Sequence, residues 1–226
     1  PLAGRLFVVA GPSGVGKGTV VRLVRERIPA THLSISVTTR APRPGERDGV
    51  DYRFVSDEDF ERMIASGELL EWEEIFGHRS GTPAGPVREA LEAGVDVILE
   101  LDVTGARHVR EVMPQAVLIL LEPPTLEELE RRLRSRGTET EERLAARLSK
   151  ADWELGQRGA FDEVIVNDEA ERAADQVAAI IDASPQVGGS SEDTDAADKP
   201  AKETAKETAK ETAKETAKET EGPKNP

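Results

Sequence analysis

The sequence predicts an α/β protein with a parallel-sheet core flanked by helices. Short apolar runs alternate along the chain with segments of helical periodicity, which is the organisation of such a sheet. The first apolar run, residues 6–10, is followed at once by a glycine-rich segment and then by a helical pattern. A chain of 226 residues with 37% hydrophobic residues is long enough to bury a core in one domain.

The predicted elements follow in order along the chain. Four apolar runs are interpreted as core strands, at residues 6–10, 95–102, 116–121 and 164–166. Helical spacing fills the gaps between them. The predicted helices are residues 20–28, two segments marked by Leu126, Leu129 and Leu133 and by Leu144, Leu148 and Trp153, and residues 170–181.

A stretch of different character separates the first helix from residue 95. It is rich in arginine, proline, glycine and acidic residues, and we interpret it as an inserted lobe that selects the substrate. The pattern ends after residue 183, and five tandem Ala-Lys-Glu-Thr units occupy residues 201–220. This composition cannot bury a core, so residues 185–226 are predicted to form a disordered or transiently helical tail without a part in catalysis.

Composition narrows the function classes. The net charge of −14, from 30 basic and 44 acidic residues, argues against a general affinity for nucleic acid or an anionic membrane. The absence of cysteine excludes disulfides and thiolate catalysis, and three scattered histidines make no obvious zinc site. The longest apolar stretches have strand length, and residues 1–4 do not resemble a signal peptide. We therefore expect a cytoplasmic protein.

The glycine-rich segment after the first strand has the pattern of a phosphate-binding loop (P-loop). Its glycines permit a tight turn whose backbone N–H groups converge on phosphate, and the helix that follows adds a favourable dipole. Lys17 supplies a mobile charge for the β- and γ-phosphates of a nucleoside triphosphate. The segment comprises Gly11, Pro12, Ser13, Gly14, Val15, Gly16, Lys17, Gly18 and Thr19.

One position of this loop departs from the usual pattern. A serine or threonine that holds magnesium normally follows the lysine, but here that residue is Gly18. Thr19 is no simple substitute, because one residue along a helix rotates the side chain by about 100°. We expect Mg²⁺ to be held mainly by nucleotide phosphates, waters and acidic side chains.

Several further motifs, in order along the chain, identify a family resemblance. Residues 34–52 resemble the nucleoside-monophosphate-binding motif of guanylate kinases, and Gly-Pro-Ser-Gly-x-Gly-Lys is their form of the P-loop. The resemblance covers about residues 5–182. Its other motifs are Glu71-Trp72, Gly81-Thr82, Glu100-Leu101-Asp102, Gly105-Ala106-Arg107, Arg136-Gly137-Thr138-Glu139 and Val164-Ile165-Val166-Asn167.

The resemblance implies a P-loop kinase that converts ATP and GMP, and also dGMP, to ADP and the nucleoside diphosphate, with Mg²⁺. It implies a guanylate kinase-like domain over residues 1–184. Within it we expect a core at about residues 5–35 and 93–184, a GMP-binding lobe at about 36–92 and a small helical lid at about 134–148.

Three residues of the inserted lobe are expected to bind the GMP phosphate. Guanylate kinases use the residues corresponding to Arg40, Arg43 and Tyr52 for this contact. Two guanidinium groups beside prolines also suit bidentate phosphate binding in their own right. The alternative is a solvated basic loop.

Four residues are expected to recognise the base. Guanine presents N–H donors where adenine presents a ring acceptor, so an ionised carboxylate prefers guanine. The resemblance assigns this role to Glu71 and Asp102, with Ser36 and Thr82 as hydroxyl partners. The alternatives are that Asp102 is a strand-end acid capping the next helix and that Glu71 is a solvated helical residue.

The transfer step requires alignment and charge neutralisation rather than a covalent nucleophile. The resemblance places Arg132 and Arg136 beside the lid and Arg147 on its return helix, where they act with Lys17. The mixed charges of residues 131–150 leave ordinary surface ion pairs as an alternative for each arginine.

The chain departs from the family where a tyrosine commonly precedes Gly-Thr, because Ser80 stands there. We hypothesise that Arg79 supplies a substitute charge. Two other function classes remain: a non-catalytic guanylate-kinase-like interaction module, and a P-loop kinase for a phosphorylated sugar. The second leaves Glu71 and Asp102 unexplained.

Overall fold

The computed structural model describes residues 3–75, 77–135 and 140–185. All of them belong to one compact unit, Pro1–Gly189. The predicted lid at 134–148 and the predicted tail at 185–226 therefore fall partly outside the described residues.

A five-stranded parallel sheet forms the centre of the fold, in the order β2-β7-β1-β8-β9. Its middle strand, β1, has five apolar residues that are all buried, as expected of a strand covered on both faces. The strands are β1 (Leu6–Ala10), β2 (His32–Leu33), β7 (Val97–Leu101), β8 (Val117–Glu122) and β9 (Glu163–Val166).

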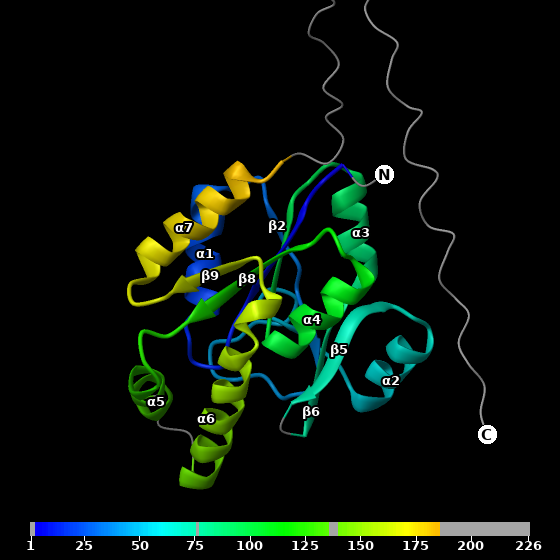
Figure 1. The fold of residues 1–226 in the computed structure, drawn as a ribbon. Coiled ribbons are helices and arrows are strands. Elements are labelled where there is room, and N and C mark those ends of the chain that lie inside the picture. The colour runs from blue at the N-terminus through cyan, green and yellow to red at the C-terminus, as the bar shows by residue number, and fades with distance from the viewer. Residues whose placement is uncertain (1–2, 76, 136–139, 186–226) are drawn as a thin grey trace, which may run out of the picture. The chain divides into compact units, whose positions relative to one another are not determined.

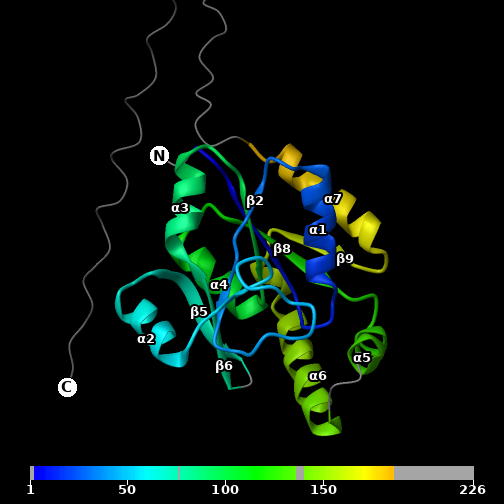
Figure 2. The same ribbon diagram turned by 180° about the vertical axis from the view of Figure 1, so that it is seen from behind.

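Helices cover both faces of this sheet (Figures 1 and 2). Helices α1 (Lys17–Arg27) and α7 (Ala170–Ala183) share a core with Phe7 and Val9 of β1. Helices α3 (Ala84–Glu92) and α4 (Val103–Val112) pack with Leu6 and Val8, which point to the opposite face. The alternation of side chains along β1 thus supplies two separate cores.

A second, mixed sheet has the order β4-β3-β6-β5. Its strands are β3 (Val37–Thr38), β4 (Arg53–Phe54), β5 (Leu69–Ile75) and β6 (His78–Pro83). Helix α2 (Asp57–Ala65) covers one side of it through Phe60 and Met63. Ser56 caps this helix by accepting the backbone N–H of Asp59.

Two further helices, α5 (Leu126–Ser135) and α6 (Glu141–Gly156), pack on each other through Leu129, Leu133 and Leu144. The short 3-10 helix η1 (Arg158–Ala160) follows α6. Figure 1 shows α6 and the second sheet at the same end of the central sheet, away from the N-terminus. This end carries the P-loop, which links β1 to α1.

The four predicted core strands are present with small shifts at their ends. The first helix begins at Lys17, earlier than the predicted residue 20, and Gly16, with a φ of 102°, occupies the position that precedes it. The helix marked by Leu144, Leu148 and Trp153 is α6, in which Leu144 is buried and Trp153 is 47% exposed. Strand β2 has no counterpart among the predicted strands, because it is two residues long and is defined only by pairing with β7.

Candidate active site

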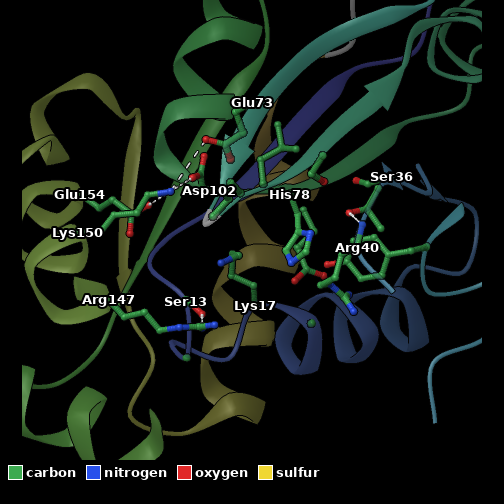
Figure 3. Close-up of a pocket in the computed structure, with 18 of the residues that line it drawn as sticks. Ser13, Lys17, Ser36, Arg40, Glu73, His78, Asp102, Arg147, Lys150 and Glu154 are labelled. Atoms are coloured by element: carbon green, nitrogen blue, oxygen red, sulfur yellow. Dashed lines mark hydrogen bonds and ion pairs between the residues drawn. The ribbon is translucent and has the colours of Figure 1, made fainter. Parts of the chain in front are cut away.

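A cavity of about 550 Å³ lies between the P-loop, the second sheet and α6 (Figure 3). Polar and charged side chains from all three surround it. The predicted site residues that line it are Ser13, Gly14, Gly16, Lys17, Gly18, Thr19, Ser36, Arg40, Arg43, Tyr52, Glu71, Asp102 and Arg147.

The P-loop depends on glycine for close packing. A Cβ on Gly11 would lie 2.4 Å from the carbonyl oxygen of Leu121, and one on Gly16 would lie 2.6 Å from Asn167 Nδ2. Both residues have positive φ, at 150° and 102°. Gly16 leaves the first N–H groups of α1 uncapped by any described side chain, so this helix end suits an anion.

Lys17 lies folded over its own loop. Its Nζ donates to the carbonyl oxygens of Gly11 at 2.6 Å and Pro12 at 3.3 Å. These two bonds hold the ammonium against the loop, and Lys17 also lines the cavity. Neither Gly11 nor Pro12 is among the lining residues; their carbonyls instead hold the lysine.

Two of the predicted arginines, Arg132 on α5 and Arg147 on α6, contact the P-loop. Arg147 donates to Ser13 Oγ at 2.8 Å and lines the cavity. Arg132 donates to the carbonyl oxygens of Val15 at 3.2 Å and Asn167 at 3.1 Å. Arg132 also pairs with Glu128 at 2.8 Å, so the expected surface ion pair and the loop contact coexist. Arg136 lies outside the described residues.

Arg40 and Tyr52 lie together at the lobe end of the cavity. The guanidinium of Arg40 lies over the Tyr52 ring, 5.1 Å from its centroid. It also donates to both carboxylate oxygens of Glu46, at 2.8 and 3.0 Å. The hydrogen bond from Arg40 outweighs burial and holds the pKa of Glu46 below its usual value. Arg43 is exposed at the same edge, and its backbone N–H donates to Glu46 at 2.7 Å.

Glu71 is a buried residue of β5, only 5% exposed. The alternative of a solvated helical position is therefore wrong. Burial raises the pKa of Glu71 to about 7, although the hydrogen bond from Thr82 opposes this rise. Thr82 is 1% exposed and is absent from the cavity lining, and its hydroxyl donates to Glu71 Oε1.

Asp102 caps the next helix, as the alternative interpretation predicted, and it also lines the cavity. It directly follows β7 and caps α4, because its Oδ1 accepts the backbone N–H of Gly105 at 2.9 Å. Its other oxygen, Oδ2, accepts the ammonium of Lys150 at 2.6 Å. Helix capping and a place in the site are thus compatible.

Sequence analysis missed four charged residues that line the cavity: Glu73, Glu100, Lys150 and Glu154. The spacing of residues along strands and helices could have identified three of them. Glu73 follows Glu71 by two positions on a strand, Glu100 precedes Asp102 by two, and Lys150 follows Arg147 by three on a helix. Each spacing places the missed residue on the same face as a predicted one.

The space beside Gly18 contains a carboxylate. A Cβ at this position would lie 3.5 Å from Glu100 Oε2, so Glu100 approaches the place where a serine or threonine side chain would begin. Burial raises the pKa of Glu100, and the charge of Lys17 opposes this rise. One oxygen donor here fits a cation that keeps waters and phosphates as its other ligands.

The hypothesis that Arg79 replaces the missing tyrosine is not supported by the geometry. Arg79 borders the cavity, but its guanidinium donates to Asp57 at 2.9 Å and Glu61 at 2.8 Å on α2. Adjacent residues of a strand point to opposite faces of the sheet. His78 and Ser80 of β6 therefore share one face, and Arg79 points to the other.

Comparisons with known proteins agree with this arrangement. The family model described as guanylate kinase matches residues 3–184. The chain belongs to the guanylate kinase family. A guanylate kinase from Nocardia farcinica is 59% identical over 179 residues, which cover 78% of this chain and 93% of that protein. One from Mycobacterium sp. (strain MCS) is 52% identical over 196 residues, covering 86% and 96%.

A solved structure supports the fold as well. The crystal structure of guanylate kinase from Anaplasma phagocytophilum matches with a TM-score of 0.68 and 35% identity, covering 80% of this chain and 86% of that one. Guanylate kinases transfer the γ-phosphoryl group of ATP to GMP, and this chain is an ATP:GMP phosphotransferase. Among the described residues, no helix has the length and apolarity needed to span a membrane.

Proposed function

We propose that the cavity binds both substrates of the guanylate kinase reaction at once, with ATP on the P-loop and GMP against the second sheet. The observation that carries this proposal is that Lys17, Arg40 and Glu71 line one cavity although they come from three separate elements. The residues assigned to the ATP phosphates, to the GMP phosphate and to the guanine base therefore border one volume of about 550 Å³, which supports binding of both substrates together.

ATP is assigned to the loop of residues 11–19. The backbone N–H groups at the start of α1 bind its phosphates, and Lys17 exchanges its contacts with Gly11 and Pro12 for phosphate oxygens. Mg²⁺ is assigned to nucleotide phosphates, waters and Glu100; when bound, it neutralises charge on the phosphate oxygens.

GMP is assigned to the opposite end. Arg40, Arg43 and Tyr52 bind its phosphate, so the phosphate takes the place of Glu46 on the guanidinium of Arg40. Glu71 and Asp102 accept the N–H donors of guanine, and Ser36 adds a hydroxyl. AMP offers a ring acceptor where guanine offers N1–H, so it would leave a buried carboxylate without a donor.

Phosphoryl transfer then occurs between the two ends. The acceptor is a phosphate oxygen of GMP, which displaces ADP from the γ-phosphorus without an enzyme nucleophile. Lys17, Arg132, Arg136 and Arg147 are assigned to the charge that spreads over the transferring group. Packing of the second sheet and α6 around the substrates excludes water, which would otherwise hydrolyse ATP.

The direct test is a panel of acceptors. Purified protein with ATP and Mg²⁺ is assayed for nucleoside diphosphate formation from GMP, dGMP, AMP and UMP. Turnover of the guanine nucleotides far above the other two supports the assignment of Glu71 and Asp102. Comparable turnover of AMP would overturn the base-reading assignment, and binding of GMP without turnover would favour the interaction-module alternative.

A further inference from the structure

Asp102 is held through both of its carboxylate oxygens. Oδ1 accepts the N–H of Gly105 at 2.9 Å, and Oδ2 accepts the ammonium of Lys150 at 2.6 Å. The first bond is local, because it caps the helix that Asp102 begins. The second comes from α6, 48 positions further along the chain. Lys150 therefore influences how Oδ2 is presented to the cavity.

Lys150 lies among several acidic side chains. Its Nζ is 3.8 Å from Glu154 Oε1 and 4.0 Å from Glu73 Oε2, and Glu71 lines the same cavity (Figure 3). The side chains of Glu73 and Glu154 are only 13% and 2% exposed. Burial raises the pKa of both carboxyl groups, and the hydrogen bond between Glu73 and Asp102 raises that of Glu73 further.

Asp102 remains acidic in these surroundings because of its donors. Burial alone would raise the pKa of Asp102, but the hydrogen bond with Glu73, the charge of Lys150 and the N–H of Gly105 outweigh burial and lower it. A protonated Asp102 would be a weaker acceptor for the N–H donors of guanine, because it has lost its negative charge and one of its oxygens has become an O–H donor. Loss of the ammonium removes one of these contributions and so raises the pKa of Asp102, although the hydrogen bonds from Glu73 and Gly105 remain.

The ammonium also connects three parts of the fold. Lys150 belongs to α6, Asp102 directly follows β7 of the central sheet, and Glu73 lies on β5 of the second sheet. Arg147, three residues earlier on α6, contacts the P-loop at Ser13. One helix thus contacts the end of the cavity assigned to ATP and the end assigned to the guanine base.

We propose that Lys150 is a positioning residue that sets the preference for guanine, by holding the Asp102 carboxylate toward the cavity as an acceptor. The inference rests on the base-reading role proposed for Asp102. Lys150 acts through Asp102 and contacts no reacting atom, so its removal changes selection of the acceptor more than the transfer step.

The test replaces Lys150 by methionine, which keeps the length of the side chain and removes its charge. In Lys150→Met, kcat/KM for GMP falls by at least about tenfold through a higher KM, the scale expected when a hydrogen bond to a charged group is lost. The values for AMP and the KM for ATP stay near those of the wild type. Lys150→Arg restores most of the preference because it keeps the charge.

Two further variants make the outcome decisive. Arg143→Met is the matched control, because Arg143 is exposed on the same helix and does not line the cavity. Asp102→Asn is measured beside it. If Asp102→Asn lowers the GMP-to-AMP ratio and Lys150→Met does not, the role of Lys150 is wrong. If neither variant lowers it, the base-reading role of Asp102 itself is wrong. Equal losses for GMP and AMP in Lys150→Met also overturn the inference, and thermal unfolding identifies any misfolded variant.

Discussion

The hydroxyl of Thr82 donates to Glu71 Oε1 at 2.7 Å, and both side chains are buried. The two residues lie opposite each other on β5 and β6, where the ladder pairs Glu71 with Thr82. The bond fixes one carboxylate oxygen, while the other, Oε2, lies beside Gly105 of α4, where an added Cβ would be 3.0 Å away. It also opposes the rise in the pKa of Glu71 that burial causes.

The preference for guanine should depend on pH. Because the pKa of Glu71 is about 7, the carboxyl is largely protonated below this value and ionised above it. The ionised form accepts guanine N–H groups, whereas the protonated form offers an O–H that suits the ring acceptor of adenine. We expect the ratio of kcat/KM for GMP to that for AMP to rise between about pH 6 and 8, by up to tenfold per unit.

The comparison with AMP removes a confounding titration, because both nucleotides carry the same phosphate. Initial rates for the two acceptors across this range provide the measurement. A ratio that stays constant with pH would mean that Glu71 does not read the base or that it is ionised throughout.

Removal of the Thr82 hydroxyl should move this pH dependence. Thr82→Val deletes a hydrogen bond to a charged group, which contributes about 1.5–3 kcal/mol. The ionised form of Glu71 loses that stabilisation, so the midpoint moves to higher pH and kcat/KM for GMP at neutral pH falls. Thr82→Ser keeps the hydroxyl and serves as the control. Identical pH profiles for the valine and serine variants would contradict this explanation.

Lys17 should affect turnover rather than folding. Its ammonium binds only carbonyl oxygens of its own loop in the described structure. We expect Lys17→Met to lower kcat by about 10²–10³-fold, the usual effect of removing one donor from a site of developing charge. Its unfolding temperature should stay close to that of the wild type. Arg25→Met, on the exposed side of the same helix, is the control; a comparable loss there would point to damage of α1.

Arg132 should affect both stability and turnover. Its two terminal nitrogens donate to Val15 and Asn167, and a lysine cannot replace both bonds. Arg132→Lys is expected to lower the free energy of unfolding by about 1–3 kcal/mol through loss of the bond to the Asn167 carbonyl, since the Val15 carbonyl keeps the side-chain amide of Asn167 as a donor. The control is Arg131→Lys, because Arg131 pairs with the same Glu128 on the exposed side. Chemical denaturation and kcat, measured on both variants, separate the two effects.

The proposed role of Glu100 is tested by the Mg²⁺ concentration that the enzyme requires for activity. We expect Glu100→Gln to need a higher Mg²⁺ concentration for half-maximal activity, because a neutral amide is a weaker ligand for a hard cation. Its maximal rate at saturating Mg²⁺ should recover much of the difference. A titration that coincides with that of the wild type would remove Glu100 from the magnesium site.

The parts that the sequence predicts well are those set by local patterns. The run at residues 6–10, the glycines and Lys17 specify β1, the P-loop and the start of α1 within twenty residues, and the structure confirms the order of these elements. Two strands of the second sheet, β3 and β4, are beyond such patterns, because they contain two residues each and exist only through pairing with other segments.

Side-chain partners were harder to predict than side-chain types. That Asp102 matters follows from its motif, but its contact with Lys150 depends on how α6 packs on the core. The same holds for Arg79, which forms ion pairs with Asp57 and Glu61 of α2. No local sequence pattern connects Arg79 to these two acids. Only the packing of whole elements determines such pairs.

The helix cap formed by Asp102 limits how this enzyme can evolve toward another base. The residue assigned to guanine also begins α4, and loss of such a cap typically costs about 1 kcal/mol of stability. A mutation here that relaxes the choice of nucleotide therefore also weakens the protein. Glu71 lies on a strand and caps no helix, so a substitution at Glu71 or Thr82 can change the base preference without the loss of a helix cap.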